Sequence, residues 1–256
     1  MTASTIGFLG IIALFALLII RIPVAFAMFV VGFFGIIALD SSRAAFGLLA
    51  SEAFTLASSP QLIVVPLFIL MGNVASVTGM SRRLYDAAYA LIGEFRGGLA
   101  SATVIGCGGF AALSGSSVAS ALTMGKVALA EMDRYDYDPR LSTGVVAAGG
   151  TLGILIPPST GFVIYAILTE QSIGRLFLAG VLPGILMLLL FIVAIMVICT
   201  IRPGFGPAGP STTFPQKLRA LAGALPIVGV IFLTIGGIYG GFFSPVEASA
   251  VGAGIV

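Results

Sequence analysis

The chain has 256 residues, of which 12 are Lys or Arg and 10 are Asp or Glu, so 9% of its side chains are charged and 59% are apolar. Because soluble domains carry about 25% charged residues, this composition and a mean hydropathy of +1.17 exclude a water-soluble globular protein and a disordered chain. The absence of His excludes His-based catalysis and His metal sites, and a net charge of +2 gives no basic footprint for nucleic acid.

The first 60 residues begin with two apolar runs, 6–20 and 24–39, which are separated by Arg21-Ile22-Pro23. Each run is short for the roughly 20 residues of a spanning helix, so flanking residues must contribute. A secretory signal peptide is the alternative for the first run. No Lys or Arg precedes that run and a second apolar run follows at once, so a membrane helix is favoured.

Two helices of different character are predicted next. Residues 62–77 are apolar, whereas 81–96 combine apolar residues at helical spacing with charged residues on the rest of the wheel. The second pattern predicts an amphipathic helix, either at the membrane interface or as an arm against another element. Asp86 lies on its polar face; an intramembrane aspartyl protease needs two paired carboxylates, and the apolar runs offer no partner for it.

Residues 97–130 predict a re-entrant hairpin. The apolar, Gly-rich segment 97–113 meets the polar tip Ser114-Gly115-Ser116-Ser117, and a weakly apolar segment then returns to the charged loop 131–140. Both arms are modest in length, which favours entry and return on one side of the membrane. Gly106, Gly108 and Gly109 have the wrong spacing for a dinucleotide loop and indicate close helix packing.

Residues 141–168 predict a broken helix. The run is long enough to span, but Gly149-Gly150-Thr151-Leu152-Gly153 leads to Ile156-Pro157-Pro158-Ser159 in its middle. Adjacent prolines remove two backbone donors and disfavour helix at the residue before each of them. Unwound backbone at membrane depth is tolerated only where protein or a water-lined cavity surrounds it.

The last third predicts a short linking helix at 172–180, a span at 181–200, a Pro/Gly-rich loop at 201–219, a span at 221–239 and a new element from 240. The loop carries Arg202, Lys217 and Arg219 and no acid, which places it in the cytoplasm by the positive-inside rule. The hairpin then opens to the cytoplasm. The loop 131–140, with four acids and two arginines, does not itself support this orientation.

The candidate site pairs the hairpin tip, 114–117, with the break, 149–159. Helix N-termini favour anions, and unwound carbonyls with Ser or Thr hydroxyls can coordinate Na⁺. The pattern therefore predicts a coupled ion and substrate site without carboxylates. A Gly/Ser packing seam between helices is the structural alternative.

Three further features have structural interpretations. Lys126 lies in the second hairpin arm. Its side chain is interpreted as one that snorkels to the membrane interface, in preference to a counter-ion for the substrate. Ser244, Pro245 and Glu247 fit the start of a helix, which favours Glu247 as a capping residue over a direct functional role. Cys107 and Cys199 lie far apart in apolar runs and are predicted to be free thiols.

Six stretches together resemble the large membrane subunit of tripartite ATP-independent periplasmic (TRAP) transporters, the C4-dicarboxylate large permease type. Several are weak individually, but their order and spacing cover nearly the whole chain. They are PLFILMGN (66–73), RGGLA (96–100), LSGSSVA (113–119), GTLGILIPPS (150–159), SIGRLFLAG (172–180) and GFFSPVEA (241–248).

The resemblance implies an all-α integral membrane protein of the elevator type, with a scaffold, a moving transport domain and two inverted repeats, of which this chain holds the first and the start of the second. The resemblance also implies that the protein is not an enzyme and that it needs no cofactor beyond Na⁺, the coupling ion. The implied division is 1–60 scaffold helices; 61–96 scaffold helix and amphipathic arm; 97–170 transport-domain half; 171–219 linking helix, span and cytoplasmic loop; 220–256 start of the second repeat.

The implied function is Na⁺-coupled import of small organic anions, such as dicarboxylates, sialic acids or sugar acids, across the bacterial inner membrane. The implied partners are a small four-span membrane subunit and a periplasmic substrate-binding protein. The residues carried over for the cation are Ser114, Ser116, Ser117, Gly150, Gly153, Ile156 and Pro157. Those assigned to the substrate are Gly115, Ser117, Ser120, Thr151, Pro158 and Ser159.

The sequence departs from the family in two ways. Ser120 stands where members often have a small acid or amide, which bears on the substrate rather than the fold. The family is also much longer, so the chain is expected to be the N-terminal part of a longer protein. The alternatives are another elevator-type Na⁺/divalent-anion symporter, a non-transporting membrane subunit, and a membrane enzyme, against which the missing His and paired acids argue.

Overall fold

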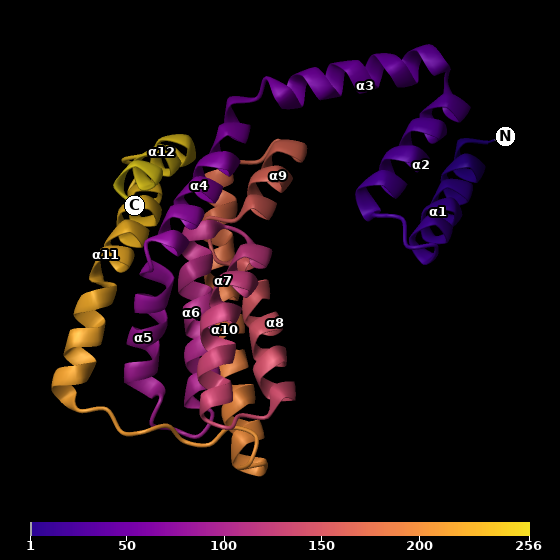
Figure 1. Ribbon diagram of the computed structural model, residues 1–256. Coiled ribbons are helices and arrows are strands. Elements are labelled where there is room, and N and C mark those ends of the chain that lie inside the picture. Colours follow the sequence, from indigo (N-terminus) through magenta and orange to yellow (C-terminus); the bar gives the residue numbers. More distant parts are fainter. Residues whose placement is uncertain (1) are drawn as a thin grey trace. The chain divides into compact units, whose positions relative to one another are not determined.

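The computed structural model describes residues 2–256 and is built from helices, which hold 81% of the residues, with no strand in that range. Within residues 2–256, twelve α-helices and one short 3-10 helix follow one another (Figure 1). Residues 1–60 and 61–256 form two separate compact units. Four helical stretches are long and apolar enough to cross a membrane: Pro60–Val77, Pro139–Leu168, Ile173–Ile201 and Phe214–Tyr239.

The first unit contains α1 (Ala3–Ile19), α2 (Val24–Leu39) and α3 (Ser42–Ala57). The interruption predicted at Arg21-Ile22-Pro23 is confirmed, because Arg21 adopts φ +66° between α1 and α2. Large apolar side chains of α1 and α2 are exposed almost all round, as expected for helices that face lipid or another protein. The mixed stretch after residue 41 forms α3, whose N-terminus is capped by the Ser41 hydroxyl.

The second unit begins with a 3-10 turn, η1 (Pro60–Ile63), followed by α4 (Val64–Val77) and α5 (Met80–Ile92). Gly79, at φ +76°, separates the two α-helices. The amphipathic pattern of α5 is confirmed: Leu84 and Ala88 are buried, whereas Arg82, Arg83 and Asp86 are exposed.

The helix α6 (Gly98–Ser114) is the centre of the second unit, and 15 of its 17 residues are buried. It packs against α7 (Ser117–Arg134) and α8 (Pro139–Leu155), which lie beside it in Figure 1. The prediction of close packing at its glycines is confirmed. A Cβ at Gly108 would lie 2.8 Å from Leu188, and one at Gly109 would lie 2.6 Å from Leu84. The second hairpin arm runs to Arg134, four residues further than expected.

The chain continues with α9 (Thr160–Leu168), α10 (Ile173–Ile201), α11 (Phe214–Tyr239) and α12 (Pro245–Ile255). The prediction of a linking helix and a separate span after residue 171 is wrong, because α10 is one continuous helix of 29 residues with Pro183 inside it. Gly180 serves packing rather than termination: its Cβ would lie 2.5 Å from the Leu155 carbonyl oxygen. The two cysteines are free and buried, as predicted.

The predicted cap of α12 is confirmed. The Ser244 hydroxyl accepts from the Glu247 amide at 3.3 Å, and the Ser244 amide donates to the Glu247 carboxylate at 2.8 Å. This reciprocal pair is a capping box. Hydrogen bonds from the Ser244 amide and hydroxyl lower the pKa of Glu247.

The loop between α10 and α11 is bonded to the open end of the hairpin, below α5 and α6 in Figure 1. The Gly97 amide donates to the Gly206 carbonyl at 3.0 Å, and the Asp138 amide donates to the Phe205 carbonyl at 3.1 Å. Tyr137 donates its hydroxyl to the Pro207 carbonyl at 2.9 Å. The base of the hairpin, the α7–α8 turn and the loop after α10 therefore lie at one end of the unit.

Candidate functional site

The tip of the hairpin is a two-residue turn between α6 and α7. Gly115 adopts φ +60°, a left-handed conformation that glycine reaches at low cost, and its amide closes α6 by donating to the Ala111 carbonyl at 2.9 Å. Ser116 is extended and caps α7, with its hydroxyl accepting from the Ala119 amide at 3.3 Å. The tip thus places a helix C-terminus next to a helix N-terminus.

The predicted break is present between α8 and α9. The first helix closes when the Ile156 amide donates to the Leu152 carbonyl at 2.8 Å, and Ile156 itself is extended. Pro157 and Pro158 follow, joined by a cis peptide bond, and Ser159 stands as N-cap of α9 without a side-chain capping bond. The break therefore also combines a helix C-terminus with a helix N-terminus.

The tip and the break are in direct contact. The Gly115 carbonyl accepts two hydrogen bonds from Thr160, one from its amide and one from its hydroxyl, each at 3.0 Å. A Cβ on Gly115 would lie 2.6 Å from the Pro158 carbonyl oxygen. No side chain larger than hydrogen fits there without movement, so the two backbones meet directly.

The glycines of α8 extend this contact along the first turn of α7. A Cβ on Gly153 would lie 2.7 Å from the Ser117 amide nitrogen and 2.9 Å from the Ser116 carbonyl carbon. A Cβ on Gly150 would lie 2.7 Å from the Ala121 Cβ and 3.2 Å from the Ser117 carbonyl oxygen. Both glycines thus bring the end of α8 against the start of α7.

The polar groups at the site are hydroxyls and backbone atoms. The Ser114 and Ser120 hydroxyls lie 3.3 Å apart, and both residues are buried. Ser159 is 1% exposed, and its hydroxyl is buried without a hydrogen-bond partner in the described chain. No Asp, Glu, Lys or Arg occurs in 112–124 or 148–162. An orphaned buried hydroxyl calls for a partner such as a bound ion or water.

Not every predicted residue lies at this contact. Thr151 is exposed on α8, and its hydroxyl donates to the Ala148 carbonyl at 2.6 Å. The Ile156 side chain packs toward Gly108 and Gly184, so this residue offers the site only its backbone. Pro157 and Pro158 are buried at the break.

Two residues at the contact were not among the predicted site residues. Thr160 supplies both hydrogen bonds to the tip, and its place directly after the predicted break is the one local signal for it. Gly72 lies on α4, where a Cβ would be 2.6 Å from the Ser114 Cα. No local pattern indicates that approach, because Gly72 and Ser114 are 42 positions apart in the sequence.

The arrangement offers groups of the kinds that coordinate ions of either sign. The ends of α6 and α8 leave carbonyl oxygens without intrahelical partners, and the starts of α7 and α9 leave amides. Carbonyls and hydroxyls suit a hard cation, whereas amides at helix N-termini suit an anion. The residues present therefore fit a small cation and an acidic group side by side.

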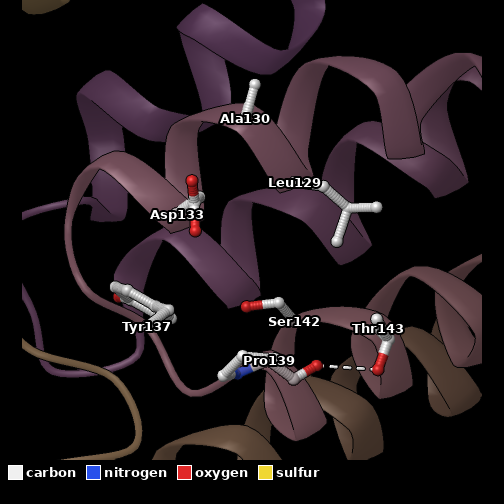
Figure 2. Close-up of a pocket in the computed structure, with 7 residues that line it drawn as sticks. All are labelled: Leu129, Ala130, Asp133, Tyr137, Pro139, Ser142 and Thr143. Carbon is white, nitrogen blue, oxygen red and sulfur yellow. Dashed lines mark hydrogen bonds between the residues drawn. The ribbon is translucent and has the colours of Figure 1, made fainter.

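A cavity of about 340 Å³ lies at the opposite end of the hairpin from the tip, where α7 turns into α8 (Figure 2). Its hydroxyls are already engaged: Thr143 donates to the Pro139 carbonyl at 2.7 Å, Ser142 to the Asp138 carbonyl at 3.1 Å, and Tyr137 to the Pro207 carbonyl. Only the exposed Asp133 carboxylate is left, so this cavity is a weaker candidate than the tip. Its lining is Leu129, Ala130, Asp133, Tyr137, Pro139, Ser142 and Thr143.

Comparison with known proteins gives a consistent family. Residues 11–256 match the family described as tripartite ATP-independent periplasmic transporter, DctM component. The C4-dicarboxylate TRAP transporter large permease protein DctM of Pseudomonas aeruginosa is 42% identical over 205 residues, which cover 80% of this chain and 48% of the relative. The protein of the same name from Vibrio cholerae is 38% identical over 246 residues, covering 94% of this chain and 53% of the relative.

A relative whose name gives a different substrate aligns over almost all of the chain. The sialic acid TRAP transporter large permease protein SiaM of Vibrio cholerae is 31% identical over 251 residues, 98% of this chain and 56% of the relative. The chain spans about half the length of these curated relatives. These relatives are transporter permease subunits and not enzymes.

Proposed function

Because the chain belongs to the DctM-component family of tripartite ATP-independent periplasmic transporters, we propose that it forms part of a Na⁺-coupled permease that imports small organic anions across the inner membrane. The observation that carries the proposal is the direct contact of the hairpin tip with the broken helix. The contact gathers four helix ends and an unpartnered buried hydroxyl in a region without charged residues.

The proposed cation ligands are backbone carbonyls and hydroxyls of the tip and the break. Gly150 and Gly153 admit the first turn of α7, and Ser114 and Ser116 supply hydroxyls. Na⁺ is held well by such neutral oxygen ligands where a helix is broken. The other proposed cation-binding residues are Ser117, Ile156 and Pro157.

The proposed substrate group is a carboxylate or another acidic group near Gly115, Ser117, Ser120, Pro158 and Ser159. The first amides of α7 and α9 favour negative charge there. Bound Na⁺ nearby adds to that attraction, which couples the two ligands. Since Thr151 faces away on α8, Thr160 is the better candidate at that end of the site.

The names of the relatives support organic acids as cargo, because they include C4-dicarboxylates and sialic acid. We expect the partners to be a small membrane subunit and a periplasmic binding protein, and the movement to be of the elevator type. In that mechanism the hairpin and the broken helix cross the membrane as one body. The short contacts between α6, α7 and α8 fit such a unit.

Na⁺ binding can be tested without knowing the cargo. Both cysteines are buried, so a thiol-reactive fluorogenic dye reports thermal unfolding of the purified protein. We expect the melting temperature to rise with Na⁺ and not with equal K⁺ or choline, because a ligand that binds only the folded state stabilises it. Equal melting curves in all three salts would contradict the cation assignment.

Transport itself is tested in proteoliposomes that contain the permease, its small subunit and the binding protein. Labelled succinate and sialic acid are offered with and without an inward Na⁺ gradient. The proposal predicts uptake of an organic anion that requires the gradient. Uptake that does not depend on the Na⁺ gradient would contradict the proposed Na⁺ coupling but would still agree with a permease function.

A further inference from the structure

A further polar cavity lies on the second unit, beside α7 and beyond the hairpin tip. This hydroxyl notch has a volume of about 210 Å³ and lies where α4, α5 and α7 meet. Its polar lining comprises Ser76, Ser81, Thr123 and Lys126. The Ser76 and Thr123 hydroxyls are 3.4 Å apart. A cavity of this size exceeds the about 30 Å³ that a water occupies in the liquid.

Lys126 brings an uncompensated positive charge to the notch. No acidic residue lines the notch, and the one ion pair found in residues 2–256 joins Lys217 to Glu94. Lysine in a membrane-spanning region is costly unless it pairs with an anion or reaches water. Lys126 is exposed on α7, so its ammonium group is free to bind an anion from outside the chain.

The start of α5 adds to this preference. Its N-cap is Gly79, which offers no side chain to the free amides of the first turn. Ser81 is 4% exposed and lines the notch, and its hydroxyl makes none of the hydrogen bonds found in the described chain. Arg82 and Arg83 follow directly and are exposed. A hydroxyl donor without a partner, on a largely buried residue, thus lines the same cavity as Lys126.

An apolar groove adjoins the notch and shares Leu122 and Lys126 with it. The groove has a volume of about 490 Å³, runs between α7 and α8, and is lined mainly by Ala121, Gly125, Leu129, Val146 and Ala147. A small, highly polar acid would gain no binding energy from such an apolar surface. An amphiphile with an anionic head and a hydrocarbon tail matches both parts.

We propose that the hydroxyl notch binds the phosphate of an anionic phospholipid whose acyl chain lies in the apolar groove. Lys126 provides the charge, Ser81 and the first amides of α5 donate hydrogen bonds, and the groove covers the tail. Basic pockets between membrane helices are known to favour lipid headgroups. The inference is independent of Na⁺ coupling, since it uses no residue of the tip or the break.

The test is native mass spectrometry of the purified protein in detergent, titrated with phosphatidylglycerol or phosphatidylcholine. Lys126→Gln is expected to weaken phosphatidylglycerol binding about fivefold, or about 1 kcal/mol. Lys126→Arg is expected to retain it, and Ser81→Ala to weaken it. The control Arg175→Gln removes an exposed cation on α10 and is expected to bind like the wild type. Wild-type binding by both Lys126→Gln and Ser81→Ala would overturn the proposal.

The tail is tested separately. Ala147→Phe fills the apolar groove from an exposed position, so it is expected to weaken phosphatidylglycerol binding. Inorganic phosphate and glycerol phosphate are added as competitors at concentrations equal to the lipid. If these two anions compete poorly with phosphatidylglycerol, the result supports a lipid site. Competition as strong as that of the lipid itself, together with no effect of Ala147→Phe, would replace the lipid with a free anion and overturn the assignment.

Discussion

The two ends of the hairpin are held in different ways. At the tip, backbone meets backbone through glycines, and Thr160 is the one side chain that donates to the Gly115 carbonyl. At the base, side chains and a loop from much later in the sequence make several separate hydrogen bonds and an ion pair. The comparison suggests that the tip is sensitive to a single added methyl group, whereas the base distributes its stability over many weak contacts.

The largest effect is expected at Gly115. Replacement with Ala forces a side chain into φ +60° and brings its Cβ to 2.6 Å from the Pro158 carbonyl oxygen. We expect Gly115→Ala to lose about 2–5 kcal/mol of stability, from about 1–2 kcal/mol of backbone strain and about 1–3 kcal/mol of overpacking. The measurement is the thiol-dye melting temperature with and without Na⁺, and the Na⁺-dependent shift should also disappear.

Gly144→Ala is the matched control. Gly144 lies within α8, is exposed, and has open space where its Cβ would be. Because Ala is the better helix former, the control should be as stable as the wild type or more so. Equal losses from the two substitutions would show that the tip is not a special contact.

At the base, the largest single effect is expected from Tyr137→Phe. The Tyr137 hydroxyl donates to the Pro207 carbonyl at 2.9 Å and accepts from the Leu99 amide at 3.3 Å. Removing it leaves two backbone groups unpaired, which should cost about 1–2 kcal/mol. We expect this variant, unlike Gly115→Ala, to keep the Na⁺-dependent rise in melting temperature.

Tyr137 also gives a pH test. Burial raises the pKa of Tyr137 to about 12, above the about 10 of an unfolded tyrosine. The folded state therefore holds this proton more tightly, and the associated stability is present below pH 10 and is lost as the pH rises toward 12. Tyr137→Phe lacks that contribution, so its stability should fall less steeply between pH 10 and 12. Parallel pH profiles would contradict the role of the phenol.

The local features of the tip could be predicted from the sequence, but those of the base could not. Ser114-Gly115-Ser116-Ser117 and Pro157-Pro158 interrupt helices through their own backbone preferences, so the turn and the break are visible in a single sequence. The loop after residue 201 bonds to Ala90, Gly93, Gly97 and Tyr137, which lie far away in the sequence and share no pattern with it.

Two predicted element boundaries are wrong, for different physical reasons. The sequence suggested a helix end near Gly180, yet tertiary packing against Leu155 explains that glycine and the helix continues. The loop after residue 201 is predicted to reach Arg219, but α11 starts at Phe214, where the Thr213 amide donates to the Gln216 side chain at 2.8 Å. In the site itself, Gly72 was missed because only the fold brings α4 against Ser114.

A smaller effect is expected at Thr160, and it separates the two bonds at the tip. Thr160→Val removes the hydroxyl bond to the Gly115 carbonyl but retains the amide bond, and the shape of the side chain is nearly kept. The expected cost is about 0.5–1.5 kcal/mol. If the Thr160 hydroxyl also serves the bound cation, the Na⁺ concentration for half-maximal stabilisation will rise. An unchanged Na⁺ response would restrict Thr160 to a structural role.

The smallest effect is expected at the ion pair between Lys217 and Glu94. The Lys217 ammonium lies 2.9 Å from the Glu94 carboxylate, but the two side chains remain 24% and 31% exposed, so water screens the pair. Such pairs contribute about 0.2–1 kcal/mol, and salt weakens them further. Lys217→Gln should therefore lower stability slightly in dilute buffer and converge with the wild type in 1 M choline chloride. The Thr212 hydroxyl, which donates to the Ala90 carbonyl at 2.7 Å, still holds the loop in that variant. A large loss that persists at high salt would mean that the base, like the tip, depends on one contact.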